Sequence, residues 1–110
     1  MSAHSVRIGD LNRRLTLLAP VESDDGAGGV TRGYAPVTTL WAQVKPLGGR
    51  PEVAAEAFGA ALRYAIVVRH RDGIGTRHRF QDGARVYRVL AARDSADRRF
   101  LEIDAEERQD

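Results

Sequence analysis

The sequence contains no cysteine among its 110 residues, which excludes disulfide bonds, thiolate catalysis and cysteine-based zinc sites. Aromatic residues make up only 6% of the chain, with a single Trp, and one Lys accompanies sixteen Arg. No apolar run approaches the roughly 18 residues of a membrane helix, and the first residues lack the apolar core of a signal peptide. We therefore expect a soluble intracellular protein of one domain, residues 1–110, stabilised by packing and by oligomerisation.

Charge is unevenly distributed along the chain. The net charge is only +2, but residues 1–60 are neutral, residues 61–99 carry a net +6 and residues 100–110 carry −4. Such a distribution indicates contacts between segments, contacts between copies of the chain, or a basic face directed at a polyanion. The high proportion of arginine is by itself a weak indicator of nucleic-acid binding.

Alternation of apolar and polar side chains dominates the sequence and predicts β-strands. In residues 37–45, Leu40, Ala42 and Val44 share one face, and Trp41 lies on the opposite face. Similar patterns are found in residues 11–21, 61–71, 77–80, 84–93 and 100–106. About six short strands separated by turn residues predict an all-β fold: a small antiparallel β-barrel with one short helix and long loops.

Two glycine-rich segments interrupt these strands. Residues 22–33 show no periodicity and predict a long connection. After Pro46 the chain breaks at residues 48–51, and helical spacing then predicts a short helix that begins at Pro51 and ends near Gly59. A helix this short must dock on something. The exposed side of Trp41 is expected to be covered by a helix or loop of the same chain, or by another subunit.

The residue types that carry catalysis or bind metals form no recognisable site. His70-Arg71-Asp72 matches three letters of a kinase catalytic loop, but its companion motifs are missing, and a strand that runs into an Asp-Gly turn explains it. The His residues lack metal-ligand spacing, and the sequence GAGG lacks the Lys-Ser/Thr of a phosphate-binding loop. We therefore expect no enzyme, no metal and no cofactor.

Arginines gather on the predicted strands of the second half. Arg63, Arg69 and Arg71 share one strand face, and further arginines follow within a hairpin. Two interpretations stay open. The arginines either pair with the acids of residues 102–110 or of a neighbouring subunit, or they meet DNA phosphates without reading sequence. The low aromatic content argues against a stacking platform for single-stranded nucleic acid.

Several short motifs, taken in order, resemble one known family. They are Gly9-Asp10-Leu11 followed by Arg14-Leu15, Leu40-Trp41-Ala42 with Val44 and Pro46, the sequence RHRDGI from Arg69 to Ile74, and the hairpin Asp82-Gly83 with Tyr87 and Val89. Over residues 8–104 the sequence is similar to the phage head-tail joining proteins, the head-completion or stopper group of tailed phages and phage-like gene transfer agents. Pro51 and the glycine content of the middle loop depart from the family pattern.

The resemblance implies a small β-barrel that assembles as a homo-oligomeric ring of six or twelve copies. The portal or its adaptor protein would lie on the head side, and the tail terminator or tail tube protein on the tail side. The resemblance also implies the neck of a virion or virus-like particle that is assembled in the bacterial cytoplasm, with no membrane contact and with non-specific passage of double-stranded DNA. A free-standing nucleic-acid-binding small β-barrel is the alternative function.

In the family, a lumenal loop closes the DNA channel, and two segments with the glycine content of a hinge are candidates for it here. The first set of candidates is Leu47, Gly48, Gly49, Arg50, Pro51, Glu52, Phe58 and Gly59. The second set is Asp24, Asp25, Gly26, Gly28, Gly29 and Arg32. Candidates for contact with a neighbouring subunit or with DNA are Trp41, Arg63, Arg69, Arg71, Arg77 and Arg79.

Overall fold

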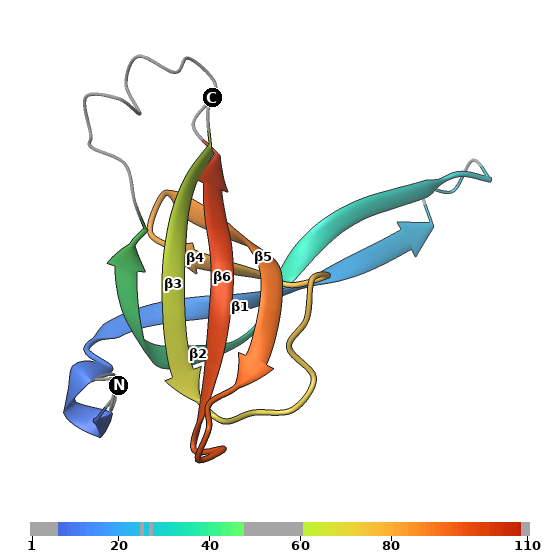
Figure 1. Cartoon of the computed structure of the whole chain (residues 1–110). Helices are drawn as coiled ribbons and strands as arrows, with labels where there is room; N and C mark the ends of the chain where they lie inside the picture. Colours follow the sequence, from blue (N-terminus) through green and yellow to red (C-terminus); the bar gives the residue numbers. More distant parts are fainter. Residues whose placement is uncertain (1–6, 25, 27, 48–60, 109–110) are drawn as a thin grey trace.

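Six antiparallel strands form a closed barrel in the computed structural model, which describes residues 7–24, 26, 28–47 and 61–108 (Figure 1). The strands close in the order β1-β2-β3-β6-β5-β4. After a 3-10 turn, η1 (Ile8–Asp10), the elements are β1 (Arg13–Asp24), β2 (Val30–Pro46), β3 (Ala61–Arg69), β4 (Arg79–Asp82), β5 (Arg85–Asp94) and β6 (Phe100–Arg108). The predicted all-β antiparallel barrel is confirmed.

The barrel interior is filled by the inward-facing side chains of all six strands, as period-2 alternation requires. The buried cluster consists of Leu15, Leu17, Ala42, Ile66, Val68, Phe80, Tyr87, Val89, Leu101, Ile103 and Ala105. Leu40 and Val44 pack against this cluster, so the predicted inward row on β2 is confirmed. The ring of Tyr64 meets that of Tyr87 edge-on, with centroids 5.1 Å apart, a favourable aromatic geometry.

A second, smaller apolar cluster lies on the outside of the barrel. It joins Leu11, Val67 and Phe100. Val67 and Phe100 have the outward-facing parity of their strands, since Val68 and Leu101 face the core. Leu11 was predicted to begin the first strand, but that strand begins at Arg13. Leu11 instead follows η1, where its amide donates to the Ile8 carbonyl at 3.0 Å.

A two-stranded arm extends from the barrel beyond the point where β4 and β3 stop pairing with β1 and β2 (Figure 1, right). We call residues 19–24 and 30–35 the β1–β2 arm. The prediction of a long connection over residues 22–33 was wrong, because β1 continues to Asp24 and β2 begins at Val30. Glycine is required only in the turn at the end of the arm. Gly26 and Gly28 there have backbone φ angles of 81° and 84°, values that residues with a side chain rarely adopt.

Tight turns predicted from Asp-Gly pairs are confirmed. Asp82 pairs with Arg85 across a two-residue turn, and Gly83 has a φ of 61°, as a hairpin turn with glycine in its first central position requires. The strand predicted over residues 61–71 ends earlier, at Arg69, so Arg71 does not share the strand face of Arg63 and Arg69. The predicted short helix lies outside the described residues. Among the helices of the described residues, none is long and apolar enough to cross a membrane.

Candidate interaction surfaces

The first candidate gating segment is described only at its beginning. Leu47 is 43% exposed, and its amide donates to the Arg63 carbonyl at 2.8 Å, which extends the pairing of β2 with β3 by one residue. The remaining candidates of this set lie outside the described residues: Gly48, Gly49, Arg50, Pro51, Glu52, Phe58 and Gly59.

The second candidate segment forms the end of the β1–β2 arm rather than a loop. Asp24 and Arg32 belong to β1 and β2, and Asp24 pairs with Val30 in the ladder. Gly26, Gly28 and Gly29 lie in the connection between them, and Asp25 lies outside the described residues. The sequence suggested flexibility here, but the pairing of Val21 with Gly33 and of Ser23 with Thr31 continues the hairpin.

Two arginine–aromatic stacks lie on one face of β1 and β2. The guanidinium carbon of Arg14 is 5.5 Å from the ring centroid of Trp41, and that of Arg79 is 4.1 Å from the ring centroid of Tyr34. Arg14 pairs with Trp41 and Pro20 with Tyr34, an even spacing along β1 that places both rings on the outer side, opposite Leu15 and Leu17. We call the surface of Arg14, Trp41, Tyr34 and Arg79 the aromatic face.

Much of the aromatic face is open. Trp41 is 55% exposed and Tyr34 41% exposed. Beside Tyr34, an open groove of about 520 Å³ is lined by Pro20, Val21, Glu22, Gly33, Tyr34, Arg77 and Arg79. The prediction that Trp41 lies on the face opposite the aliphatic row is confirmed. Its cover by another segment of the chain is not found among the residues that the structure describes.

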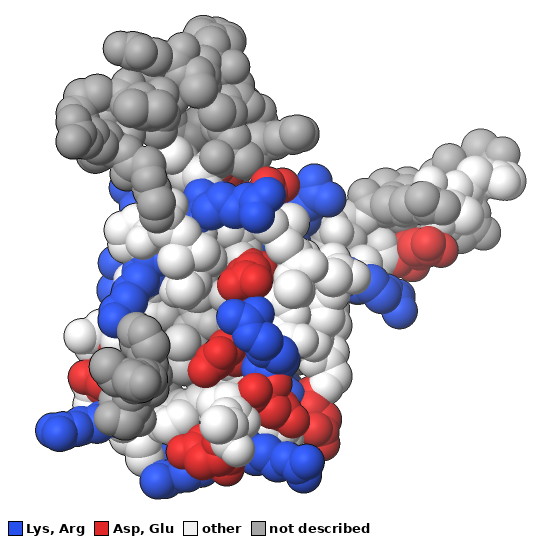
Figure 2. Space-filling view, in the orientation of Figure 1, with Lys and Arg blue, Asp and Glu red and all other residues white. Residues whose placement is uncertain are grey.

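Acidic residues of β6 pair with arginines of β5 in the same chain. Arg93 lies 3.1 Å from an Asp104 carboxylate oxygen and 3.5 Å from one of Glu102, and Arg88 lies 3.9 Å from one of Glu106. Blue and red side chains accordingly alternate over the face formed by β3, β5 and β6 (Figure 2). The charge difference between residues 61–99 and 100–110 therefore produces contacts within one chain.

Several predicted arginines take no part in these pairs. Arg63 and Arg69 face outward on β3, and Arg71 and Arg77 are exposed in the connection to β4. None of the four is in an ion pair with another described residue. Arg79, in contrast, stacks on Tyr34.

Sequence reasoning missed a polar cluster at the barrel end where β3 begins and β6 ends. Glu107 is only 8% exposed; Tyr64 donates a hydrogen bond to it at 3.1 Å, and Arg85 lies 3.8 Å away. Burial and then the hydrogen bond to Glu107 raise the pKa of Tyr64 above its usual value. Beside this cluster, Arg13 pairs with Asp82 across β1 and β4. The alternation Leu101, Ile103, Ala105 could have placed Glu107 inside.

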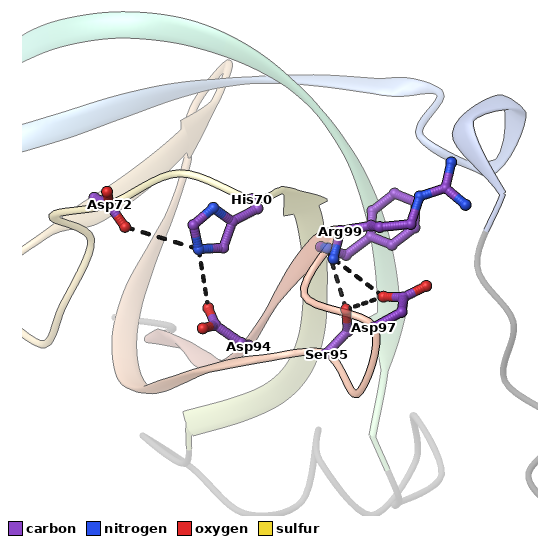
Figure 3. A network of polar contacts seen from close by, with 7 residues as sticks. His70, Asp72, Asp94, Ser95, Asp97 and Arg99 are labelled. Atoms are coloured by element: carbon purple, nitrogen blue, oxygen red, sulfur yellow. Dashed lines mark hydrogen bonds and ion pairs between the residues drawn. The ribbon is translucent and has the colours of Figure 1, made fainter.

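The opposite end of the barrel is held by a polar network around His70 (Figure 3). His70 Nε2 lies 3.3 Å from an Asp94 oxygen and 3.7 Å from one of Asp72. In the adjoining β5–β6 turn, Asp97 accepts hydrogen bonds from the Ser95 hydroxyl and the Arg99 amide at 2.6 and 3.1 Å. These bonds, that from Ser95 first, lower the pKa of Asp97. These contacts hold the turn between β5 and β6 and the residues that follow β3 in place. Within the described part of the chain, no three His, Asp or Glu side chains gather as a metal site.

Comparisons with known proteins agree with this architecture. A chain in the structure of the virion of a native gene transfer agent particle superposes with a TM-score of 0.68 and 28% identity, over 89% of this chain and 94% of that chain. The solution structure of protein SF1141 from Shigella flexneri 2a superposes with a TM-score of 0.72 and 25% identity, over 93% and 96%. No match was found among curated protein sequences. The model of the phage head completion protein family matches residues 6–108, so the chain belongs to this family of structural virion proteins, which is not an enzyme family.

Proposed function

We propose that the protein forms a ring in the neck of a phage or phage-like particle, between the portal or adaptor protein of the head and the first protein of the tail. Double-stranded DNA passes through this ring. The similarity to a chain of a gene transfer agent virion, over 89% of the sequence, carries the proposal together with the family. A role in joining head and tail follows from the family; the ring, the named partners and DNA passage are the proposed part.

The barrel and its arm support a role in assembly. A closed barrel has no free sheet edges of its own, so the arm is the part of the sheet that is open to a partner. A two-stranded hairpin is at best marginally stable alone in water. The arm and its base also carry exposed apolar side chains, among them Val21 and Val30, which are 45% and 59% exposed. Such a feature is typical of a protein that is completed by its neighbours.

The arginines outside the intrachain pairs support DNA passage. Arg63, Arg69, Arg71 and Arg77 are exposed and have no ion pair among the described residues. Arginine side chains that meet phosphates without reading bases bind all DNA sequences equally, as a channel needs. If these arginines line the lumen, their charge reduces the repulsion between the packaged polyanion and the channel wall.

A lumenal gate remains a prediction from the family resemblance. The segment that follows Pro46 is its first candidate. Particles that carry a deletion of residues 47–60 should still contain the protein but lose packaged DNA, because the channel cannot close. DNA retention measured by nuclease protection tests this. Particles of the deletion variant that protect as much DNA as wild type refute the gate at this segment and leave the ring proposal intact.

Removal of the gene tests the proposed function directly. Without the protein, we expect heads that have packaged DNA and free tails that fail to join, and a plasmid-borne copy of the gene should restore joined particles. Normal joined particles in its absence contradict the proposal. A monomer that binds DNA with a steep salt dependence and never enters particles would instead indicate the free-standing nucleic-acid-binding barrel.

A further inference from the structure

Five of the seven large apolar residues that the described chain leaves exposed lie on β1 or β2. They are Val21, Val30, Tyr34, Val37 and Trp41. Val30, Tyr34 and Trp41 pair with Asp24, Pro20 and Arg14 and share the outer side, whereas Val21 has the parity of Leu15 and Leu17 and lies on the other side. Scattered apolar residues on a surface need no explanation, but several on one side of a ribbon indicate an interaction site. The aromatic face adds Arg14 and Arg79 beside these rings. Trp, Tyr and Arg are the residue types that contribute most to protein–protein binding.

The edges of the arm are less suited to a partner than its face. Pro20 lies in β1 and Pro36 in β2, at the part of each strand that pairs on one side only. A proline has no amide hydrogen to donate and is tolerated where its nitrogen points to a free edge. Both edges are therefore poor templates for an added strand. The groove beside Tyr34 and the stacked rings leave the outer face as the surface that a partner can fill.

The opposite wall of the barrel carries carboxylates, which the aromatic face lacks. In the closed order β1-β2-β3-β6-β5-β4, β6 lies three strands from β1 in either direction. Figure 1 shows β6 in front of the barrel and β1 behind it. The acidic side chains with outward parity on β6 are Glu102, Asp104 and Glu106. The side chains of Glu102 and Asp104 remain 39% and 38% exposed although both pair with Arg93.

The outer wall around β6 carries both signs of charge, because Arg88 and Arg93 pair with its acids; the arginines of the aromatic face would add to the contacts of these carboxylates. Arg14 and Arg79 make no ion pair with a described residue, and a guanidinium carries five N–H donors. The partly exposed carboxylates of Glu102 and Asp104 have further acceptor positions for such donors. Complementary patches on opposite sides of one molecule produce a head-to-tail contact, which closes into a ring when the rotation allows it.

We propose that the aromatic face of one copy binds the β6 face of the next copy, and that this contact is the subunit interface of the ring. The proposal rests on the proposed function, because it concerns the ring that joins head and tail. DNA is a poorer occupant, since apolar side chains such as Val37 and Trp41 gain nothing from phosphates. A head or tail protein would meet the aromatic face without any need for the carboxylates on the opposite wall.

Site-specific cross-linking tests this contact, and the absence of cysteine makes every introduced thiol unique. Thr39 is exposed on the aromatic side of β2, where it pairs with Thr16, and Ala91 is exposed beside Asp104 on β5. Particles that carry the full-length chain with both Thr39→Cys and Ala91→Cys are treated with a short thiol-reactive cross-linker. We expect a ladder of covalent oligomers of this chain. Each single substitution should give no ladder.

The matched control moves one thiol to the opposite side of the β1–β2 ribbon. Ala35 follows Tyr34 in β2 and pairs with Ala19, so Ala35→Cys combined with Ala91→Cys should give no ladder. Three results would overturn the inference: dimers from Thr39→Cys alone, adducts of Thr39→Cys with another virion protein, or an equal ladder from the Ala35→Cys pair. Particles that contain the protein but show no ladder overturn the inference and leave the proposed function standing. Joined particles that lack the protein contradict the proposed function itself.

Discussion

Replacement of Trp41 by Ala should weaken assembly while leaving the barrel folded. A Trp side chain offers roughly 200 Å² of surface, and 55% of Trp41 is exposed in the single chain. A neighbour that covers this remainder removes about 110 Å² of apolar surface from water, which is worth about 3 kcal/mol at about 25 cal/mol per Å². Each contact between copies should therefore weaken by roughly 100-fold.

The cost to the isolated domain lies on the surface. Trp41→Ala removes the stack of Arg14 and the burial of the remaining part of the ring, which together cost about 2–3 kcal/mol. The buried core is untouched, so the variant should fold and melt cooperatively at a lower Tm. The assay is the number of copies per particle, measured by quantitative mass spectrometry, beside thermal unfolding of the purified protein.

Ile8 supplies the matched control for this variant. It is 52% exposed, close to the value for Trp41, but it lies in η1 and is not one of the residues of the aromatic face. Ile8→Ala should leave the number of copies per particle unchanged. If Trp41→Ala particles contain the protein at the wild-type level, or if Ile8→Ala lowers that level equally, the reasoning about this surface is refuted.

Other consequences follow from the barrel and its polar ends. Phe80→Ala empties the fully buried position on β4 and should lower the free energy of unfolding by about 3–5 kcal/mol in urea titration; a loss below about 1 kcal/mol contradicts the described core. The raised pKa of Tyr64 contributes stability that is complete below about pH 10 and is lost as pH rises through the folded-state pKa. Tyr64→Phe should therefore make the alkaline decline in Tm shallower. An unchanged slope of Tm against pH argues against this assignment. The lowered pKa of Asp97 contributes stability that is present above about pH 3.8 and is lost as pH falls through the folded-state pKa. Asp97→Asn should flatten the decline in Tm at acid pH. A decline in Tm as steep as in the wild type contradicts the turn geometry.

The sequence predicted the barrel because its strands bury one face. In β6, Leu101, Ile103 and Ala105 alternate with outward acids, and in β2 Ala42 lies between Leu40 and Val44 in the inward row. A period of two residues identifies such strands without any knowledge of their partners. The Asp-Gly pairs then placed the turns, since glycine adopts the backbone conformation that a two-residue hairpin needs.

The arm was not predicted from the sequence because its residues need not alternate between apolar and polar. Both faces of the β1–β2 arm lie outside the barrel, so nothing requires its residues to alternate, and Gly33 within β2 weakens the strand signal further. Without that alternation, the glycines at positions 26, 28 and 29 and the acids before them indicated a loop. Only the cross-strand pairing shows that the hairpin continues to Asp24 and Val30.

The aromatic face depends on register and on closure of the barrel. Arg14 meets Trp41 because β1 and β2 pair in one particular register. Arg79 reaches Tyr34 because β4 pairs with β1 and closes the barrel, although the two residues lie far apart in the chain. Sequence alone could nominate Trp41 and Arg79 as surface candidates. It could not place them on one face, because that requires the order of the strands.

An image of the particle neck at side-chain resolution tests the central claim most directly. The account predicts a ring of this chain between the portal or adaptor and the tail, with DNA in its lumen and with Trp41 of each copy against the β6 face of the next. A ring whose copies touch through other surfaces would refute the proposed interface alone. A neck that lacks the chain, or a chain found as single copies elsewhere on the particle, would contradict the account as a whole.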